Sequence, residues 1–359
     1  MNPELSLLSL DAYGRERQKF LLARLAEMWA RCADRADPDA IHDLRVAVRR
    51  FGEVLRLFKS LAPKASRKQV QRELRRSMRL AGRTRDVDIL RDSFTHADIP
   101  LPRSLALYLE NERAAAEAGL RAALAVGNAT HFHERWRETL LLDQPGVSTG
   151  GEAISQNTTD TSKPAVTSAP AGARLMLPGL LEEYCAKGER LAQLGTKPAK
   201  LHGLRLAGKH LRYSLEIFRP IYGRRMDDLL GFLRDTQGSL GQISDATASI
   251  AWLYEAGLEQ SAEICQLQIY LEQRAQKGAS RFTEYWVDHW GLPSFRQHWI
   301  SYLTRYAGHG PIQQLLRRST QPGPGASDAS PSPDVVKPPD VMKQIDTTPD
   351  PAPLAKVVM

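Results

Sequence analysis

A histidine followed by a row of cationic side chains occurs twice in the sequence. The copies are IHDLRVAVRRFGEVLRLF at residues 41–58 and LHGLRLAGKHLRYSLEIF at residues 201–218. Residues three, four and seven apart share one face of a helix. This groups His42, Arg45, Arg49 and Arg56 in the first copy, and His202, Arg205, Lys209 and Arg212 in the second. Guanidinium groups donate several N–H bonds in a planar fork that matches phosphate oxygens. Each row therefore predicts a phosphate-binding face.

The histidine at the head of each row adds a group whose charge changes near neutral pH. Phosphates bound beside it would favour its protonated form. A lone histidine at a helix start is more often a hydrogen-bonded structural residue. The recurrence of His42 and His202 keeps both the structural and the ligand-binding interpretation open.

A second pair of motifs follows the two rows in the same order. LAGRTRDVDIL spans residues 80–90 and SLGQISDATASI spans residues 239–250. His42 and His202 are 160 positions apart, and Asp86 and Asp245 are 159 apart, which indicates an internal duplication and a two-lobed fold. We expect the glycine of each motif to end a helix. Asp86 and Asp245 would then cap the next helix or orient the cationic rows, and a catalytic role is less well supported.

Positive charge is concentrated between residues 41 and 91, where fifteen Lys and Arg face five Asp and Glu, whereas the whole chain carries +8. A helix starting at Ser66 would place Lys68, Arg72, Arg75 and Arg79 on one face, with Glu73 as its single acid. An ordinary solvated helix usually interleaves acids four residues from its bases. The pattern favours a polyanion-binding face over a plain solvated one, and adds Arg75, Arg79 and Arg83 to the candidates.

The periodicity predicts an all-α fold. The sequence has 359 residues, 42% of them hydrophobic, which is enough for a core, and no segment shows strand alternation between hairpin turns. Asp37 followed by Pro38 predicts the start of the first motif helix. The other predicted helices span residues 11–33, 67–81, 84–90, 104–126, 132–142, 178–194, 198–218, 225–238, 245–256, 259–277 and 295–306.

Composition divides the chain into four parts. Residues 1–143 and 174–310 are the two helical halves. Residues 144–173 are rich in Gly, Ser, Thr, Pro and Ala and predict a flexible linker. Residues 311–359 are rich in proline and predict a disordered tail.

Several classes of protein are disfavoured. No apolar run could span a membrane and the N-terminus lacks a signal-peptide pattern, so we expect a cytoplasmic protein. Cys32, Cys185 and Cys265 are too widely spaced for a metal cluster or disulfide framework, and predict buried, reduced thiols. No nucleotide-binding or hydrolase motif is present, so we expect neither a cofactor, nor a metal, nor enzymatic activity. The aromatic residues between 282 and 306 predict core packing rather than base stacking.

Together, the four motifs resemble the CHAD family, the conserved histidine α-helical domain. Its pattern has His-x-Leu-Arg-x-x-x-Arg/Lys in each half, and the resemblance spans residues 22–307. It implies two helical bundles around a basic central cavity or cleft that binds inorganic polyphosphate, in a stand-alone bacterial protein associated with polyphosphate granules. The matching positions are His42, Arg45, Arg49, His202, Arg205, Lys209 and Arg212. The sequence departs from the pattern at Ala81, His210 and Ser244, where the family usually has Leu, Arg and Asn.

The resulting prediction is a non-enzymatic protein that binds polyphosphate, with granule proteins as further partners. The main alternative is a nucleic-acid-binding protein that uses the same basic surface for a sugar-phosphate backbone. A phosphoanhydride-processing enzyme is a weaker alternative, because it would need a metal-binding acid cluster or a nucleophile that the sequence does not show.

Overall fold

The computed structural model describes residues 3–144, 167–193, 196–256 and 261–307. Within these ranges every regular element is a helix, apart from one isolated β-bridge between Ser9 and Ser168. The first half contains α1 (Leu10–Asp34), α2 (Pro38–Leu57), α3 (Lys64–His96), α4 (Arg103–Ala129) and α5 (Phe132–Thr139). The second contains α6 (Ala169–Leu191), α7 (Pro198–Tyr222), α8 (Met226–Glu255), α9 (Ala262–Tyr285) and α10 (Pro293–Arg305). The all-α prediction is confirmed. Most of the predicted linker and all of the predicted tail lie outside the described residues.

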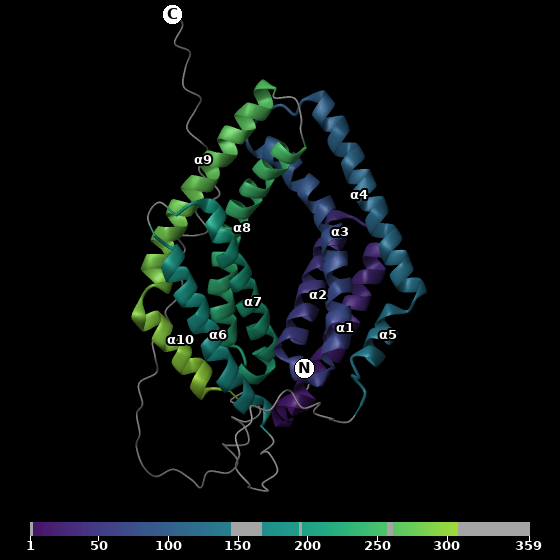
Figure 1. Ribbon diagram of the computed structural model, residues 1–359. Helices are drawn as coiled ribbons and strands as arrows, with labels where there is room; N and C mark the ends of the chain where they lie inside the picture. The colour runs from purple at the N-terminus through teal and green to yellow at the C-terminus, as the bar shows by residue number, and fades with distance from the viewer. Residues whose placement is uncertain (1–2, 145–166, 194–195, 257–260, 308–359) are drawn as a thin grey trace, which may run out of the picture.

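The two halves stand side by side, with α1–α5 on one side and α6–α10 on the other (Figure 1). In the first half α1 packs on α2, α2 on α3, and α3 on α4. In the second, α6 packs on α7, α7 on α8, and α8 on α9, which is the same order of neighbours. Across the boundary α2 meets α7, α3 meets α8 and α1 meets α6. The equivalent order of neighbours is consistent with the repeated motifs in the sequence. The internal duplication itself stays a prediction.

An apolar stripe with three- and four-residue steps runs along the first motif helix and is buried. Leu44, Val48, Phe51, Leu55 and Phe58 are each at most 4% exposed. The start of α2 is as predicted, since the Asp37 carboxylate accepts a hydrogen bond from the backbone N–H of Ala40 at 2.7 Å. On α7 the equivalent apolar residues are buried as well, among them Leu204, Leu211 and Phe218. Burial of one face fixes the rotation of each motif helix, and so fixes where its cationic row lies.

A smaller second core joins the halves where α3 and α4 meet α8 and α9, at the top of Figure 1. Leu90 and Phe94 of α3 and Leu109 of α4 pack there with Leu267 and Leu271 of α9. The long helices are therefore held at this end as well as along the main core.

The predicted helix breaks at Gly82 and Gly241 are wrong, because both glycines lie within the unbroken helices α3 and α8. Asp86 and Asp245 consequently cap no helix. A mid-helix glycine disfavours a helix by only about 1 kcal/mol, and packing against neighbouring helices outweighs that preference. The N-cap of α3 is Pro63, rather than the predicted Ser66.

The end of the predicted linker is also corrected. Ser168 caps α6 by accepting a hydrogen bond from the N–H of Ala171, so the residues from Ala169 onward are helical. Ala169 and Ala173 are fully buried, which a composition rich in small residues did not reveal.

Phe20 of α1 is 51% exposed, with the Arg17 guanidinium 4.8 Å from its ring centre. Of two burial predictions, one needs correction and one is confirmed in its main part. Cys32 and Cys185 are buried, but Cys265 is exposed. The predicted aromatic packing holds for the buried side chains, which are Phe282, Trp286, Trp290, Trp299 and Tyr302, whereas Tyr306 is 41% exposed.

A group of polar and charged side chains joins α2 to α7. Glu53 is 2% exposed and accepts hydrogen bonds from Arg56 Nε (3.0 Å) and Ser214 Oγ (2.7 Å), while His210 Nδ1 lies 2.7 Å from its second oxygen. Glu216 accepts from Arg50 of α2 and Arg212 of α7, at 2.8 and 2.9 Å. We call the side chains around Glu53 and Glu216 the α2–α7 seam.

Replacing Glu53 with glutamine should destabilise the protein by about 1–3 kcal/mol at neutral pH, because the buried network loses its negative charge and one of its two acceptor oxygens. Burial raises the pKa of the Glu53 carboxyl, but the bonds from His210, Arg56 and Ser214 outweigh it and hold this pKa below its ordinary value. Its contribution is therefore present above the ordinary pKa and is lost as the pH falls through the folded-state pKa. Urea unfolding at pH 7 and in acid measures both effects.

Glu27→Gln is the control, since the exposed Glu27 pairs with Arg24 alone among the described residues and exposed pairs contribute about 0–1 kcal/mol. Equal stability losses for the two variants would contradict the importance of the seam.

Gly188→Ala should destabilise the fold by about 1–3 kcal/mol through overpacking. A Cβ at Gly188 would collide with the ring of Trp286, which is 1% exposed and packs on Tyr184, Phe282 and Trp290. Gly179→Ala on the same helix is the matched control, because a Cβ there meets nothing within 4 Å and should stabilise α6 by up to about 1 kcal/mol. Thermal unfolding should show opposite shifts, and shifts of the same sign would contradict the assigned packing.

Candidate functional site

Cations from the two motif helices meet where α2 packs against α7. Burial lowers the pKa of Lys209 to about 7, and repulsion from Arg49, Arg205 and Arg45 adds to the effect. Burial likewise lowers the pKa of Arg45 to about 10, with Arg49 as the next cause and Arg205 as a further one. The four side chains therefore feel one another across the boundary between the halves. We call Arg45, Arg49, Arg205 and Lys209 the central cationic cluster.

Each motif glycine provides the surface on which one arginine of this cluster lies. A Cβ at Gly82 would be 3.3 Å from Arg45 Nη1, and a Cβ at Gly241 would be 3.9 Å from Arg205 Nη2. Arg45 Nη1 also donates to the carbonyl of Met78 at 3.5 Å. In both halves the arginine thus extends from its motif helix to the following helix. It reaches that helix at the glycine, where there is no side chain to block it.

The two aspartates lie beside the cluster, one from each half. Asp245 Oδ1 is 3.5 Å from Arg205 Nη2, an ion pair that holds the guanidinium. Partial desolvation raises the pKa of Asp86, Arg45 opposes this shift, and the nearby charge of Asp245 adds to it. Asp86 and Asp245 therefore neutralise part of the cationic charge from the two sides, which is an orienting role rather than a capping one.

The two histidines differ in their relation to the cluster. Both are exposed near the starts of α2 and α7. Partial burial and then repulsion from Arg205 and Lys209 lower the pKa of His202, which places its ring beside the second-half cations. Within the described residues no hydrogen bond or ion pair engages His42.

Five predicted cations lie outside the cluster, and one of them, Arg56, belongs to the α2–α7 seam through Glu53. Arg212 belongs to the α2–α7 seam, where it bonds Glu216 and stacks 4.6 Å from the ring centre of Tyr213. Arg75, Arg79 and Arg83 are exposed on α3, and no ion pair in the described part of the chain involves them.

One cation beside the cluster was missed by the sequence reasoning. Arg85 is a further cause of the lowered pKa of Arg45 and also acts on Asp86. It lies three residues after Gly82 on the same helix, a relation that the predicted helix break concealed.

Two hollows lie near the site. One, of about 550 Å³ between α3 and α4, contains Arg85, Arg91 and Arg113, and acids pair with two of them: Arg113 with Asp88 and Glu117, and Arg91 with Glu110. The other, of about 200 Å³ between α3 and α8, is lined by Asp86 and Trp252 among others. The central cationic cluster lines neither hollow, so the predicted central cavity stays a prediction.

Two further findings concern the described ranges alone. No group of three or more His, Cys, Asp and Glu side chains there is placed to hold a metal ion. None of the helices found there combines the length and apolarity that crossing a membrane requires.

Comparisons with known proteins support the fold. The crystal structure of the CHAD domain from the plant Ricinus communis superposes with a TM-score of 0.54 at 19% identity, covering 84% of this chain and 93% of that one. PptA from Streptomyces chartreusis gives a TM-score of 0.52 at 15% identity, covering 81% of this chain and 99% of that one. Identities this low show a shared fold alone. A comparison with curated proteins found no match.

The family model supplies the assignment. The CHAD domain model matches residues 19–254, which run from α1 to near the end of α8 and include both motif helices, both glycines and both aspartates. Because this match covers well over half of the sequence, the chain belongs to the CHAD domain family.

Proposed function

We propose that this protein binds inorganic polyphosphate at the central cationic cluster. The observation that carries the proposal is the convergence of Arg45, Arg49, Arg205 and Lys209 from two halves of the chain. Burial, and then repulsion from the three arginines, lowers the pKa of Lys209 to about 7. A bound polyanion relieves this repulsion, and each charge-assisted hydrogen bond to phosphate contributes roughly 1.5–3 kcal/mol.

The proposed activity is binding without turnover, in a cytoplasmic protein that associates with polyphosphate granules. Family membership supports it, since the resemblance of the motifs implies polyphosphate as the ligand. His202 and Asp245 support it geometrically: the histidine lies beside the cations, and the aspartate holds Arg205 in place. Nucleic acid carries the same phosphate chemistry, so competition between the two polymers is the decisive test.

The double variant Arg45→Ala/Arg205→Ala should lose about 100-fold or more of its affinity for long-chain polyphosphate, because one charge-assisted contact from each half disappears. Titration at two salt concentrations, with single- and double-stranded DNA as competitors at matched phosphate concentration, measures the loss and the preference. The parent protein should prefer polyphosphate.

The control variant is Arg24→Ala/Arg31→Ala, which removes two exposed arginines that pair with Glu27 and Asp43 outside the cluster. It should bind like the parent. If DNA competes as well as polyphosphate and both double variants bind alike, the cationic charge acts without a defined site and the proposal is wrong.

Binding should be accompanied by proton uptake near pH 8. The free protein holds Lys209 largely neutral there, because its pKa is about 7 against an ordinary 10.5, and phosphates beside the amine raise that pKa again. Calorimetric titrations in two buffers that differ in ionisation enthalpy measure the protons taken up. Lys209→Arg should bind without this uptake, because arginine stays charged.

The same lowered pKa has a consequence for the ligand-free protein. Between about pH 7 and 10.5 the unfolded chain binds more protons at Lys209 than the folded one does, so this residue makes stability rise with pH across that window. In the calorimetric binding titrations, uptake of as many protons by Lys209→Arg as by the parent would contradict the assignment of the uptake to Lys209.

A further inference from the structure

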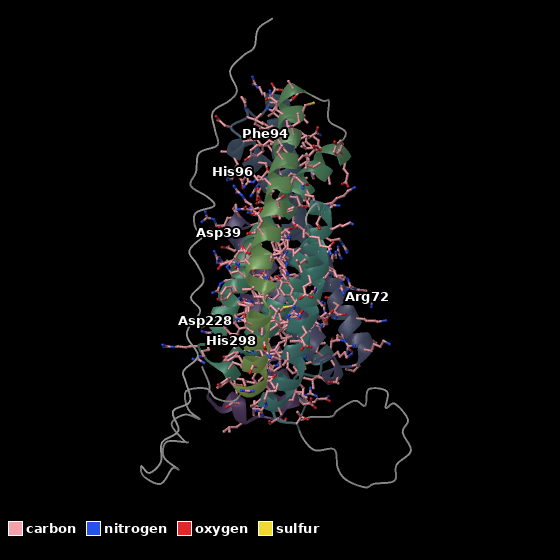
Figure 2. All side chains as sticks on the ribbon, turned by 90° about the vertical axis from the view of Figure 1, so that its left-hand side faces the viewer. Asp39, Arg72, Phe94, His96, Asp228 and His298 are labelled. Carbon is pink, nitrogen blue, oxygen red and sulfur yellow. The ribbon has the colours of Figure 1, made fainter. Side chains whose placement is uncertain are left out.

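A second group of cations lies on α3 outside the cluster. Lys68, Arg72, Arg75 and Arg79, which we call the outer row, are all exposed. Glu73, the acid that could neutralise them, instead accepts hydrogen bonds from Arg135 (2.8 Å) and Trp136 (2.9 Å). Within the described part of the chain no ion pair or hydrogen bond engages any member of the row. Figure 2 shows Arg72 extending from the flank of the molecule opposite to that of Asp39 and His96.

The outer row is continuous with the central cationic cluster. Because α3 is unbroken, positions 68, 72, 75 and 79 are followed by Gly82 and Asp86 at the same three- and four-residue steps, on one stripe of the helix. Gly82 is the residue against which Arg45 lies. Lys68 is fourteen residues before Gly82, a distance of about 21 Å along the helix. A cationic track therefore runs from the cluster towards the start of α3.

The second half has no equivalent track. Gly82 corresponds to Gly241 and Asp86 to Asp245, and the same offset pairs the outer row with Asp227, Gly231, Arg234 and Gly238. Arg234 is the one cation of this set, and Asp227 is already paired with Arg219. The halves thus share the arginine, glycine and aspartate of the centre, but only the first half continues the positive charge outward.

We propose that a long polyphosphate chain leaves the central cationic cluster in one direction, along α3, and that the outer row binds the part extending beyond the cluster. This inference rests on the proposed function and adds to it a preference for long chains. A short chain fills the cluster alone. A long chain also neutralises up to four otherwise unpaired cations and releases their counterions.

The test compares tripolyphosphate with long-chain polyphosphate on the full chain. The variant Lys68→Gln/Arg72→Gln/Arg75→Gln/Arg79→Gln should bind tripolyphosphate like the parent. Its affinity for long chains should fall by about tenfold or more, and the slope of log affinity against log salt should fall by about 3. Glutamine is a good helix former and the four positions are exposed, so α3 should persist, as circular dichroism can check.

Two pairwise variants sharpen the test with polyphosphates of graded length. Arg75→Gln/Arg79→Gln should weaken binding from a shorter length onward than Lys68→Gln/Arg72→Gln, because its positions are nearer to the cluster. The matched control Arg103→Gln/Arg190→Gln/Lys277→Gln/Arg281→Gln removes the same charge from exposed positions on α4, α6 and α9, and should bind long chains like the parent. Arg234→Gln should also leave long-chain binding unchanged.

Four results would overturn the inference. These are an unchanged long-chain affinity in the four-site variant, equal losses for short and long chains, an equal loss in the matched control, and a comparable loss in Arg234→Gln. Failure of the parent protein to bind either polyphosphate would instead overturn the proposed function. The two failures are therefore distinguishable.

Discussion

The main physical constraint on this structure is that it holds like charges close together. The partly buried Arg45 and Arg49 meet Arg205 and Lys209 where α2 packs on α7, and burial and then the resulting repulsion lower the pKa of Lys209. The attraction that keeps these helices together lies further along them, in the buried apolar stripes and in the seam around Glu53. Along this helix pair, the central cationic cluster is thus followed by cations that carboxylates neutralise. This arrangement leaves the cluster preorganised for an anion.

The seam also explains how the chain tolerates a departure from the family pattern. His210 stands where the family usually has arginine, yet its side chain contacts Glu53 and not the central cluster. The substitution therefore alters the neutralised part of the α2–α7 contact and leaves the cluster intact. Arg212 belongs to the same seam, because it pairs within α7 with Glu216, which in turn accepts a hydrogen bond from Arg50 of α2.

Glycine serves a packing purpose in α3 and α8. Gly82 and Gly241 interrupt neither helix, although each lowers helix preference by about 1 kcal/mol. Each lets an arginine side chain lie against the helix that follows its own. Continuity of α3 through Gly82 then aligns the outer row with the cluster, and this alignment gives the otherwise similar halves different outer surfaces.

The sequence alone determined the all-α class, the family and the two motif faces, because helical periodicity and a repeated motif are local properties. Leu44 and Phe51 are buried and Asp37 caps α2, as their spacing predicts. Only the tertiary structure decided that Gly82 lies within a helix, that Arg50 of α2 bonds Glu216 of α7, and that Arg85 joins Arg45 and Asp86. The partner of a long side chain can lie far away in the sequence, as Glu216 lies 166 positions from Arg50, and local pattern carries no information about such neighbours.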